Sequence, residues 1–244
     1  MRWASVRPRS GTELEPAAGW HGSGSRGFGR PLPRAFYRGS AVDLARAVLG
    51  RQLVSDQPDG RASGIIVETE AYRGARDPAS HAFRGATTRN RAMFGPPGHA
   101  YVYLIYGVHL CLNLVAEPEG LAAAVLVRAL APIEGADLMR ARRGVEAWGR
   151  LACGPGNLSV ALGLSRAHDG ADLTAEPLWL SDLPPRRFGC ATVAGSRVGV
   201  RQGIERRWRF RLDGHPCVSG PRGGDRARGR GSRQFAVDTL VGRS

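Results

Sequence analysis

Two glutamates and a tyrosine alternate along one largely apolar segment of the chain, residues 64–72. Period-two alternation in a β-strand places Glu68, Glu70 and Tyr72 on one face and the intervening residues on the other. A carboxylate beside an aromatic ring can act as a general base that holds a water molecule for attack. A solvated edge strand gives the same pattern, so the spacing alone leaves a catalytic pocket and an edge strand both open.

Aromatic residues and a histidine follow the acidic segment closely. His81 comes first, Tyr101 and Tyr103 share one face of a predicted hairpin, and Tyr106 lies beside its turn. Aromatic side chains near a carboxylate suit a pocket for a nucleobase extruded from a duplex, and an aromatic residue at a turn can insert between base steps. A hydrophobic hairpin with its tyrosines in the core explains the pattern equally well.

These residues need elements that hold them in place, and hydrophobic periodicity predicts several. A helix is expected over residues 40–50, with Ser40 as its N-cap and Gly50 at its end. The strongest hairpin signal spans residues 101–115 and is broken at Tyr106-Gly107. Further strands are expected at 52–54, 64–72, 122–129, 191–200 and 207–213, and a second helix at 132–143. Strands adjacent in sequence with few helices between them predict an α+β fold.

The composition is that of a basic globular protein. Of the 244 residues, 42% are hydrophobic, which is enough to bury a core, and the formal net charge is +14 with a pI of 11.2. Such a chain favours anionic partners, nucleic acid first. All 35 basic residues are arginines. The four cysteines lie far apart without a C-x-x-C pair, so no zinc ribbon is predicted, and we expect no metal and no cofactor.

Composition also divides the chain into a body and two tails. Residues 1–34 contain six arginines and two glutamates among Gly, Pro and Ser, and residues 220–244 contain six arginines and two aspartates. Such segments bury too little surface to fold, so both are predicted to be disordered, with residues 35–219 as the folded body. No apolar run approaches the roughly 18 residues of a membrane span, and no secretory signal is visible. We therefore expect a cytoplasmic, nucleoid-associated protein.

An ordered series of motifs runs through residues 35–219. The motifs are residues 64–74 (GIIVETEAYRG), 77–81 (DPASH), 88–107 (TRNRAMFGPPGHAYVYLIYG), 111–113 (CLN), 125–130 (VLVRAL), 154–158 (GPGNL) and 197–200 (RVGV). Together they closely resemble the alkyladenine (3-methyladenine) DNA glycosylase family. The resemblance implies a single mixed α+β domain with a curved antiparallel sheet and a protruding β-hairpin that enters the DNA minor groove. It also implies a monofunctional, cofactor-free glycosylase that hydrolyses the N-glycosidic bond of alkylated or deaminated purines in double-stranded DNA by base flipping. The product is an abasic site for base excision repair, and the enzyme is expected to act as a monomer.

The resemblance implies roles for the positions that match its motifs. Glu70 is expected to be the general base that activates water for attack on the sugar C1′. Arg128 is expected to help hold that water and the DNA near the lesion. Tyr72, His81 and Tyr103 are expected to line the pocket and stack on the extruded base.

The same motifs assign two further positions and contain two departures. Tyr106 is expected to fill the gap that the flipped base leaves in the duplex, and Asn113 to screen purines at the 2-amino position. His109 stands where some relatives have a tyrosine, and Asn157 stands where many have a lysine. Local contacts at these two positions therefore differ from the family pattern.

The absence of lysine bears on the reaction. A bifunctional glycosylase that cuts the strand through a Schiff base needs an amine nucleophile, and here the only amine is the chain's α-amino group. We therefore predict base release that leaves the strand intact. Two other function classes remain open: a non-catalytic protein that binds damaged DNA, and an RNA-binding module that uses its Arg-Gly tails. A Glu70→Gln variant that binds but does not turn over favours the enzyme, and a preference for single strands favours the RNA-binding module.

Overall fold

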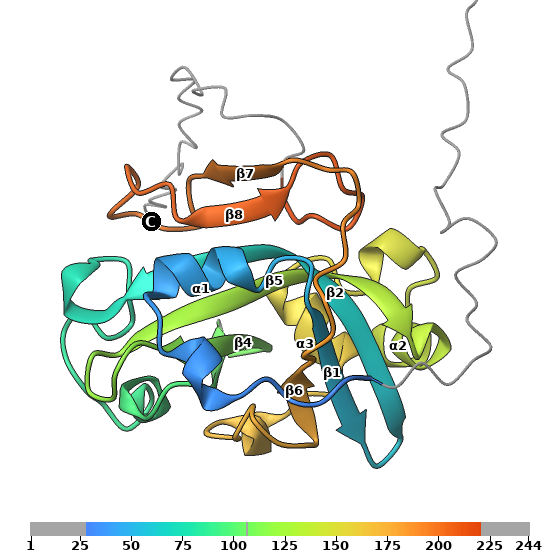
Figure 1. Ribbon diagram of the computed structural model, residues 1–244, viewed down its shortest axis with the longest axis horizontal. Coiled ribbons are helices and arrows are strands. Elements are labelled where there is room, and N and C mark those ends of the chain that lie inside the picture. Colours follow the sequence, from blue (N-terminus) through green and yellow to red (C-terminus); the bar gives the residue numbers. More distant parts are fainter. Residues whose placement is uncertain (1–27, 106, 221–244) are drawn as a thin grey trace, which may run out of the picture.

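The structure is a computed structural model that describes residues 28–105 and 107–220. One long strand, β2 (Gly60–Arg73), lies at its centre (Figure 1). The other strands are β1 (Gln52–Gln57), β3 (Ala100–Ile105), β4 (His109–Ala116), β5 (Ala123–Glu134), β6 (Leu178–Leu180), β7 (Thr192–Gly195) and β8 (Arg209–Leu212). The α-helices of the described residues are α1 (Ala41–Ala47), α2 (Ala136–Arg143) and α3 (Pro155–Ala161). Short 3-10 helices lie at Arg34–Tyr37, Gly74–Arg76, Arg91–Phe94, Trp148–Arg150 and Arg166–His168.

The strands form a single antiparallel sheet with the order β3-β4-β5-β2-β1-β6. The first part of β2 pairs with β1 and its later part with β8, which also pairs with β7 at the top of Figure 1. Register shifts between Ile66 and Glu68 interrupt the β2–β5 ladder, and such irregularities bend and twist a strand. The sheet is curved and belongs to one mixed α+β domain, so the predicted fold class is confirmed. Because β2 lies inside the sheet, the edge-strand interpretation of its glutamates is wrong.

Alternation along the central strands gives the sheet two chemically different faces. On one face Thr69 is opposite Val127 and Ala71 is opposite Val125, and all four side chains are fully buried. The Thr69 hydroxyl donates to the carbonyl oxygen of Ala45 at 2.7 Å, which joins this face to α1. The largest apolar cluster of the described residues lies on this side of the sheet, and the other face carries the acidic residues of β2 together with two smaller apolar clusters.

The predicted helices are present with shifted ends. Ser40 Oγ accepts the backbone N–H of Asp43 at 3.1 Å, as an N-cap residue does, but the helix ends before Gly50, whose φ is +81°. The second helix begins at Ala136 instead of residue 132. Pro132 still pairs with β2 at the end of β5, because strand pairing continues past the point where the helical pattern begins.

The predicted hairpin is confirmed as the pair β3–β4, with Ile105 opposite His109 at its end. Strands β7 and β8 are shorter than the predicted 191–200 and 207–213, because residues 196–208 leave the sheet to form a loop. The three-residue strand β6 was not predicted, because so short a segment carries no periodic pattern. Insertion of the hairpin into DNA remains a prediction.

Residues 28–34 fall within the predicted N-terminal tail and contact the folded domain. The Leu32 N–H donates to the carbonyl oxygen of Leu180 at 2.9 Å, and the Leu32 side chain is buried. The composition of this segment did not indicate that it is ordered, because the residues that it contacts lie far away in the sequence. The remaining tail residues, 1–27 and 221–244, lie outside the described residues. Within the described part, no helix is long and apolar enough to cross a membrane.

Candidate active site

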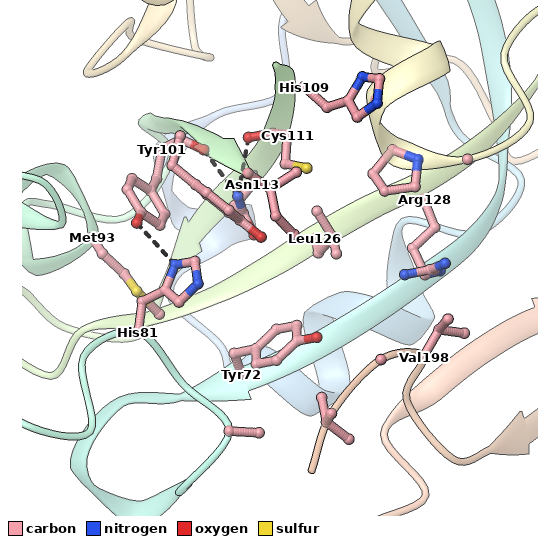
Figure 2. A pocket seen from close by; sticks show the side chains of 18 of the residues that line it. Tyr72, His81, Met93, Tyr101, His109, Cys111, Asn113, Leu126, Arg128 and Val198 are labelled. Carbon is pink, nitrogen blue, oxygen red and sulfur yellow. Dashed lines mark hydrogen bonds between the residues drawn. The ribbon is translucent and has the colours of Figure 1, made fainter. Parts of the chain in front are cut away.

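The strand register aligns four side chains in one row across the sheet. Glu70 on β2 is opposite Leu126 on β5, Leu126 is opposite Asn113 on β4, and Asn113 is opposite Tyr101 on β3. Directly opposed residues on one face of a sheet lie within contact distance of each other. Leu126, Asn113 and Tyr101 line a cavity of about 660 Å³ (Figure 2). This volume lies within the roughly 300–1,000 Å³ of ligand pockets.

Glu70 lies directly behind the cavity wall and is 0% exposed. Its Oε1 accepts the backbone N–H of Val198 at 2.7 Å, and its Oε2 accepts the hydroxyl of Tyr72 at 2.8 Å. Arg128 Nη1 lies 3.3 Å from Oε2. All three partners line the cavity, and Figure 2 shows Tyr72, Arg128 and Val198 at its wall. Burial and the adjacent Glu70 raise the pKa of Tyr72 above its ordinary value, which keeps its phenol protonated as a donor.

Arg128 is shared between two fully buried glutamates. Its Nε donates to Glu68 Oε1 at 2.8 Å while Nη1 faces Glu70. Glu68 also accepts Arg209 Nε and the backbone N–H of Ser219, each at 2.7 Å. Burial acts to lower the pKa of Arg128, but the carboxylates of Glu70 and Glu68 outweigh it and raise this pKa. Glu68, Glu70, Arg128 and Arg209 therefore form a buried, charge-balanced cluster, which we call the carboxylate–arginine quartet.

A second part of the cavity wall is aromatic. Tyr103 stacks on Tyr101 with ring centroids 5.3 Å apart, and the His81 ring meets Tyr103 edge-on at 4.3 Å. His81 Nδ1 lies 3.1 Å from the Tyr101 hydroxyl (Figure 2). Partial burial and the nearby Arg89 lower the pKa of His81 below its ordinary 6.5, and burial raises the pKa of Tyr101 to about 12. This wall is therefore uncharged at neutral pH and presents flat rings to a flat ligand.

Asn113 has a fixed orientation at the back of the cavity. Its Nδ2 donates to the carbonyl oxygens of Tyr101 at 3.0 Å and Cys111 at 3.3 Å. Tyr106, in contrast, lies outside the described residues, and its expected role stays a prediction. The structure brings all the other predicted site residues to the cavity or its wall: Glu70, Tyr72, His81, Tyr103, Asn113 and Arg128. Among the described residues, no group of His, Cys, Asp and Glu side chains could hold a metal ion.

The loop between β7 and β8 completes the cavity, a role that no pattern in the sequence indicated. Residues 198–202 line the cavity, and Arg197 precedes them directly. The guanidinium of Arg197 binds Asp77 through Nη1 at 2.5 Å and Nη2 at 2.8 Å, and both side chains are 0% exposed. Arg197 Cζ also lies 4.6 Å from the ring centroid of Tyr72. The two charged residues lie 120 positions apart in the chain, so no local pattern could pair them.

The two departures from the family pattern both lie at the cavity. His109 is exposed and lies beside Gly156, where an added Cβ would be 3.0 Å from the His109 Cβ. Asn157 Nδ2 donates to the carbonyl oxygen of Cys153 at 2.7 Å. A lysine at position 157 would carry a mobile charge there, whereas this amide is held by the backbone.

Comparison with known proteins agrees with this geometry. The family described as methylpurine-DNA glycosylase matches residues 35–216. A protein of Rubrobacter xylanophilus named "Putative 3-methyladenine DNA glycosylase" is 50% identical over 188 residues, which cover 77% of this chain and 95% of that protein. Proteins with the same name from Methanocella arvoryzae and Agrobacterium fabrum are 48% identical over 203 residues and 45% identical over 195 residues. Each of these covers 80% of this chain, with 98% and 95% of the respective relative. Matches of this extent show that the chain belongs to the methylpurine-DNA glycosylase family.

Proposed function

We propose that this protein hydrolyses the N-glycosidic bond of alkylated or deaminated purines in duplex DNA, after the damaged base has been extruded into the cavity. The observation that carries the proposal is the placement of Glu70. Its carboxylate is held by Tyr72, Arg128 and Val198 at the wall of an aromatic cavity of about 660 Å³. Enzymes that act on a single base must take it out of the stack and read it in such a pocket.

The proposed reaction uses one water molecule and one carboxylate. Water approaches Glu70 from the cavity side, where Arg128 and Val198 line the wall. Its oxygen bonds to C1′ while Glu70 accepts its proton, the C1′–N bond breaks, and the bonding electron pair leaves with the base. A purine methylated at N3 or N7 carries positive charge before this step and departs as a neutral base, so one general base can suffice. A neutral purine such as hypoxanthine departs as an anion, which takes a proton from solvent water.

Recognition of the duplex is proposed to use the β3–β4 hairpin and the arginines of the domain. Val108 in the hairpin turn is 70% exposed, and apolar residues at such tips insert between base steps in the minor groove. In this proposal Tyr106 fills the gap left by the flipped base, Asn113 screens purines at the 2-amino position, and Tyr72, His81 and Tyr103 stack on the base. Residues 35–219 are proposed to act as a monomeric glycosylase domain on nucleoid DNA.

The first test is single-turnover base release from duplexes that carry one hypoxanthine or one ethenoadenine. Abasic sites are revealed by alkali, and wild type is compared with Glu70→Gln. Wild type should release base, and the variant should lose at least about 100-fold in rate, the contribution of a general base, while it still binds the duplex. Equal rates would refute the role of Glu70. Intact binding without release by wild type would favour a narrow specificity for 3-methyladenine or a non-catalytic DNA-binding protein, and preference for single strands would favour an RNA-binding module.

A second test concerns the strand. Because the chain has no lysine, the DNA strand that has lost its base should remain unbroken until alkali is added. An end-labelled duplex incubated with wild type and analysed without alkali measures this directly. Strand cleavage by β-elimination in that sample would contradict the monofunctional assignment.

A further inference from the structure

A buried cation lies against the pocket tyrosine. Arg197 Cζ is 4.6 Å from the centroid of the Tyr72 ring, and the Arg197 side chain is 0% exposed. Tyr72 lines the cavity, whereas Arg197 does not. The guanidinium therefore covers the face of the ring that is turned away from the cavity, and the other face remains for a ligand.

The position of this cation is fixed from several sides. Its Nη1 donates to the carbonyl oxygen of Ala71 at 2.9 Å, and both Nη groups bind Asp77. Arg197 Cζ also lies 5.4 Å from the centroid of the Trp208 ring, so the guanidinium is close to two aromatic rings. These contacts hold it against Tyr72 from three segments of the chain: Ala71 belongs to β2, Asp77 follows the 3-10 helix Gly74–Arg76, and Trp208 ends the loop before β8.

A cation on one face of an aromatic ring weakens the attraction of the other face for a second cation. The negative face of the ring is what attracts a cation, and two like charges on opposite faces also repel each other. Asp77 offsets this repulsion in part, because its carboxylate binds the same guanidinium. The repulsion that remains weakens the stacking of a cationic base, such as 7-methylguanine, on Tyr72. It does not act on a neutral base such as hypoxanthine or ethenoadenine.

We propose that Arg197 is a specificity-determining residue, which acts through Tyr72 to lower the preference of the pocket for cationic bases over neutral bases. The proposal rests on the proposed glycosylase function and deepens it. The remaining aromatic wall is consistent with this role, because His81 is neutral there and adds no competing charge. With Arg197 in place, the affinity of the pocket for cationic purines exceeds its affinity for neutral damaged purines by less than it would without Arg197.

The test is a change in selectivity, measured as the ratio of two second-order release constants, for 7-methylguanine and for a neutral lesion in matched duplexes. Each constant is the single-turnover rate divided by the half-saturating enzyme concentration, so it includes entry of the base into the pocket. The variant is Arg197→Met combined with Asp77→Asn, which removes both charges and leaves no buried carboxylate unpaired. The ratio should rise by about three- to tenfold in favour of 7-methylguanine, the size of a cation–π interaction. Arg46→Met is the control, because Arg46 lies over the ring of Phe210 at 4.6 Å and not over Tyr72, and it should leave the ratio unchanged.

A purely structural clamp gives a different result. If Arg197 only holds the loop in place, both release rates fall together and the ratio stays within about twofold of wild type, which overturns the proposal. A falling ratio overturns it as well. If circular dichroism shows that the Arg197→Met, Asp77→Asn variant is unfolded, Arg197→Gln with Asp77→Asn replaces it. The glutamine amide can still donate to the carbonyl oxygen of Ala71. Wild type that releases neither base would refute the proposed function itself, a result that is distinct from an unchanged ratio.

Discussion

Removal of the Glu68 charge should destabilise the protein strongly, although Glu68 is not the residue proposed to activate water. In a Glu68→Gln variant, Arg128 and Arg209 lose the carboxylate that both contact, at 2.8 and 2.7 Å. The quartet then contains two buried guanidinium groups and one carboxylate, that of Glu70. Glutamine also offers a single acceptor oxygen where the carboxylate binds two arginines and the Ser219 N–H.

The expected loss is large because both arginines are buried. Their side chains are 8% exposed, and Glu68 is 0% exposed. Breaking a buried ion pair by removing one partner costs about 3–5 kcal/mol, because the other charge remains uncompensated. The free energy of unfolding of a typical protein is about 5–15 kcal/mol, so the loss is a large fraction of it. With a slope of about 2 kcal/mol per molar urea, the unfolding midpoint should fall by about 2 M.

Urea unfolding followed by circular dichroism measures this midpoint. Glu68→Gln combined with Arg209→Met restores the charge balance and should recover at least half of the lost midpoint, because apolar replacement of a buried pair is often neutral. Asp137→Asn is the control, since the Asp137 carboxylate is fully exposed in its pair with Arg140, and it should cause no measurable change. A double variant no more stable than the single one would refute the argument from charge balance.

Three further outcomes are expected. Tyr103→Leu removes a stacking ring and should weaken binding to a lesion duplex by about 1–3 kcal/mol, with binding to undamaged duplex unchanged in a gel-shift titration. Leu130→Ala removes a fully buried side chain from the core and should lower the free energy of unfolding by about 2–5 kcal/mol, measured by urea unfolding. Burial lowers the pKa of His215, so the unfolded state binds more protons than the native state in mild acid. The free energy of unfolding should therefore decline as the pH falls from 7 towards 5, and urea midpoints should show a smaller decline in His215→Gln.

Sequence patterns predicted those parts of the fold that depend on residues close together in the chain. The alternation of Glu68, Glu70 and Tyr72 placed them on one face, and contacts of Arg128 with both glutamates confirm that arrangement. The N-cap at Ser40 was predictable because a cap needs only residues within one turn. The arrangement of the β3–β4 hairpin was predictable for the same reason, since its strands are joined by a short turn.

The rest of the site depends on contacts between distant parts of the chain. Glu68 and Arg209 are 141 positions apart, and no periodicity in either strand shows that they meet. The Val198 N–H that donates to Glu70 belongs to the backbone, so the residue type carries no signal for it. The resemblance to a family located the motif at residues 197–200, but only the folded loop shows what that segment contacts.

The burial of the carboxylate–arginine quartet separates two steps that respond differently to ionic strength. Dissolved ions screen charges in water over about 8 Å at physiological salt, so arginine contacts with DNA phosphates weaken steeply as salt rises. The quartet is shielded from those ions, since none of its side chains exceeds 8% exposure. Salt should therefore change how often the enzyme captures DNA, while the rate of bond breakage in a fully engaged complex stays constant. We therefore expect a rise in salt to shorten the time spent on undamaged DNA without slowing the proposed base release.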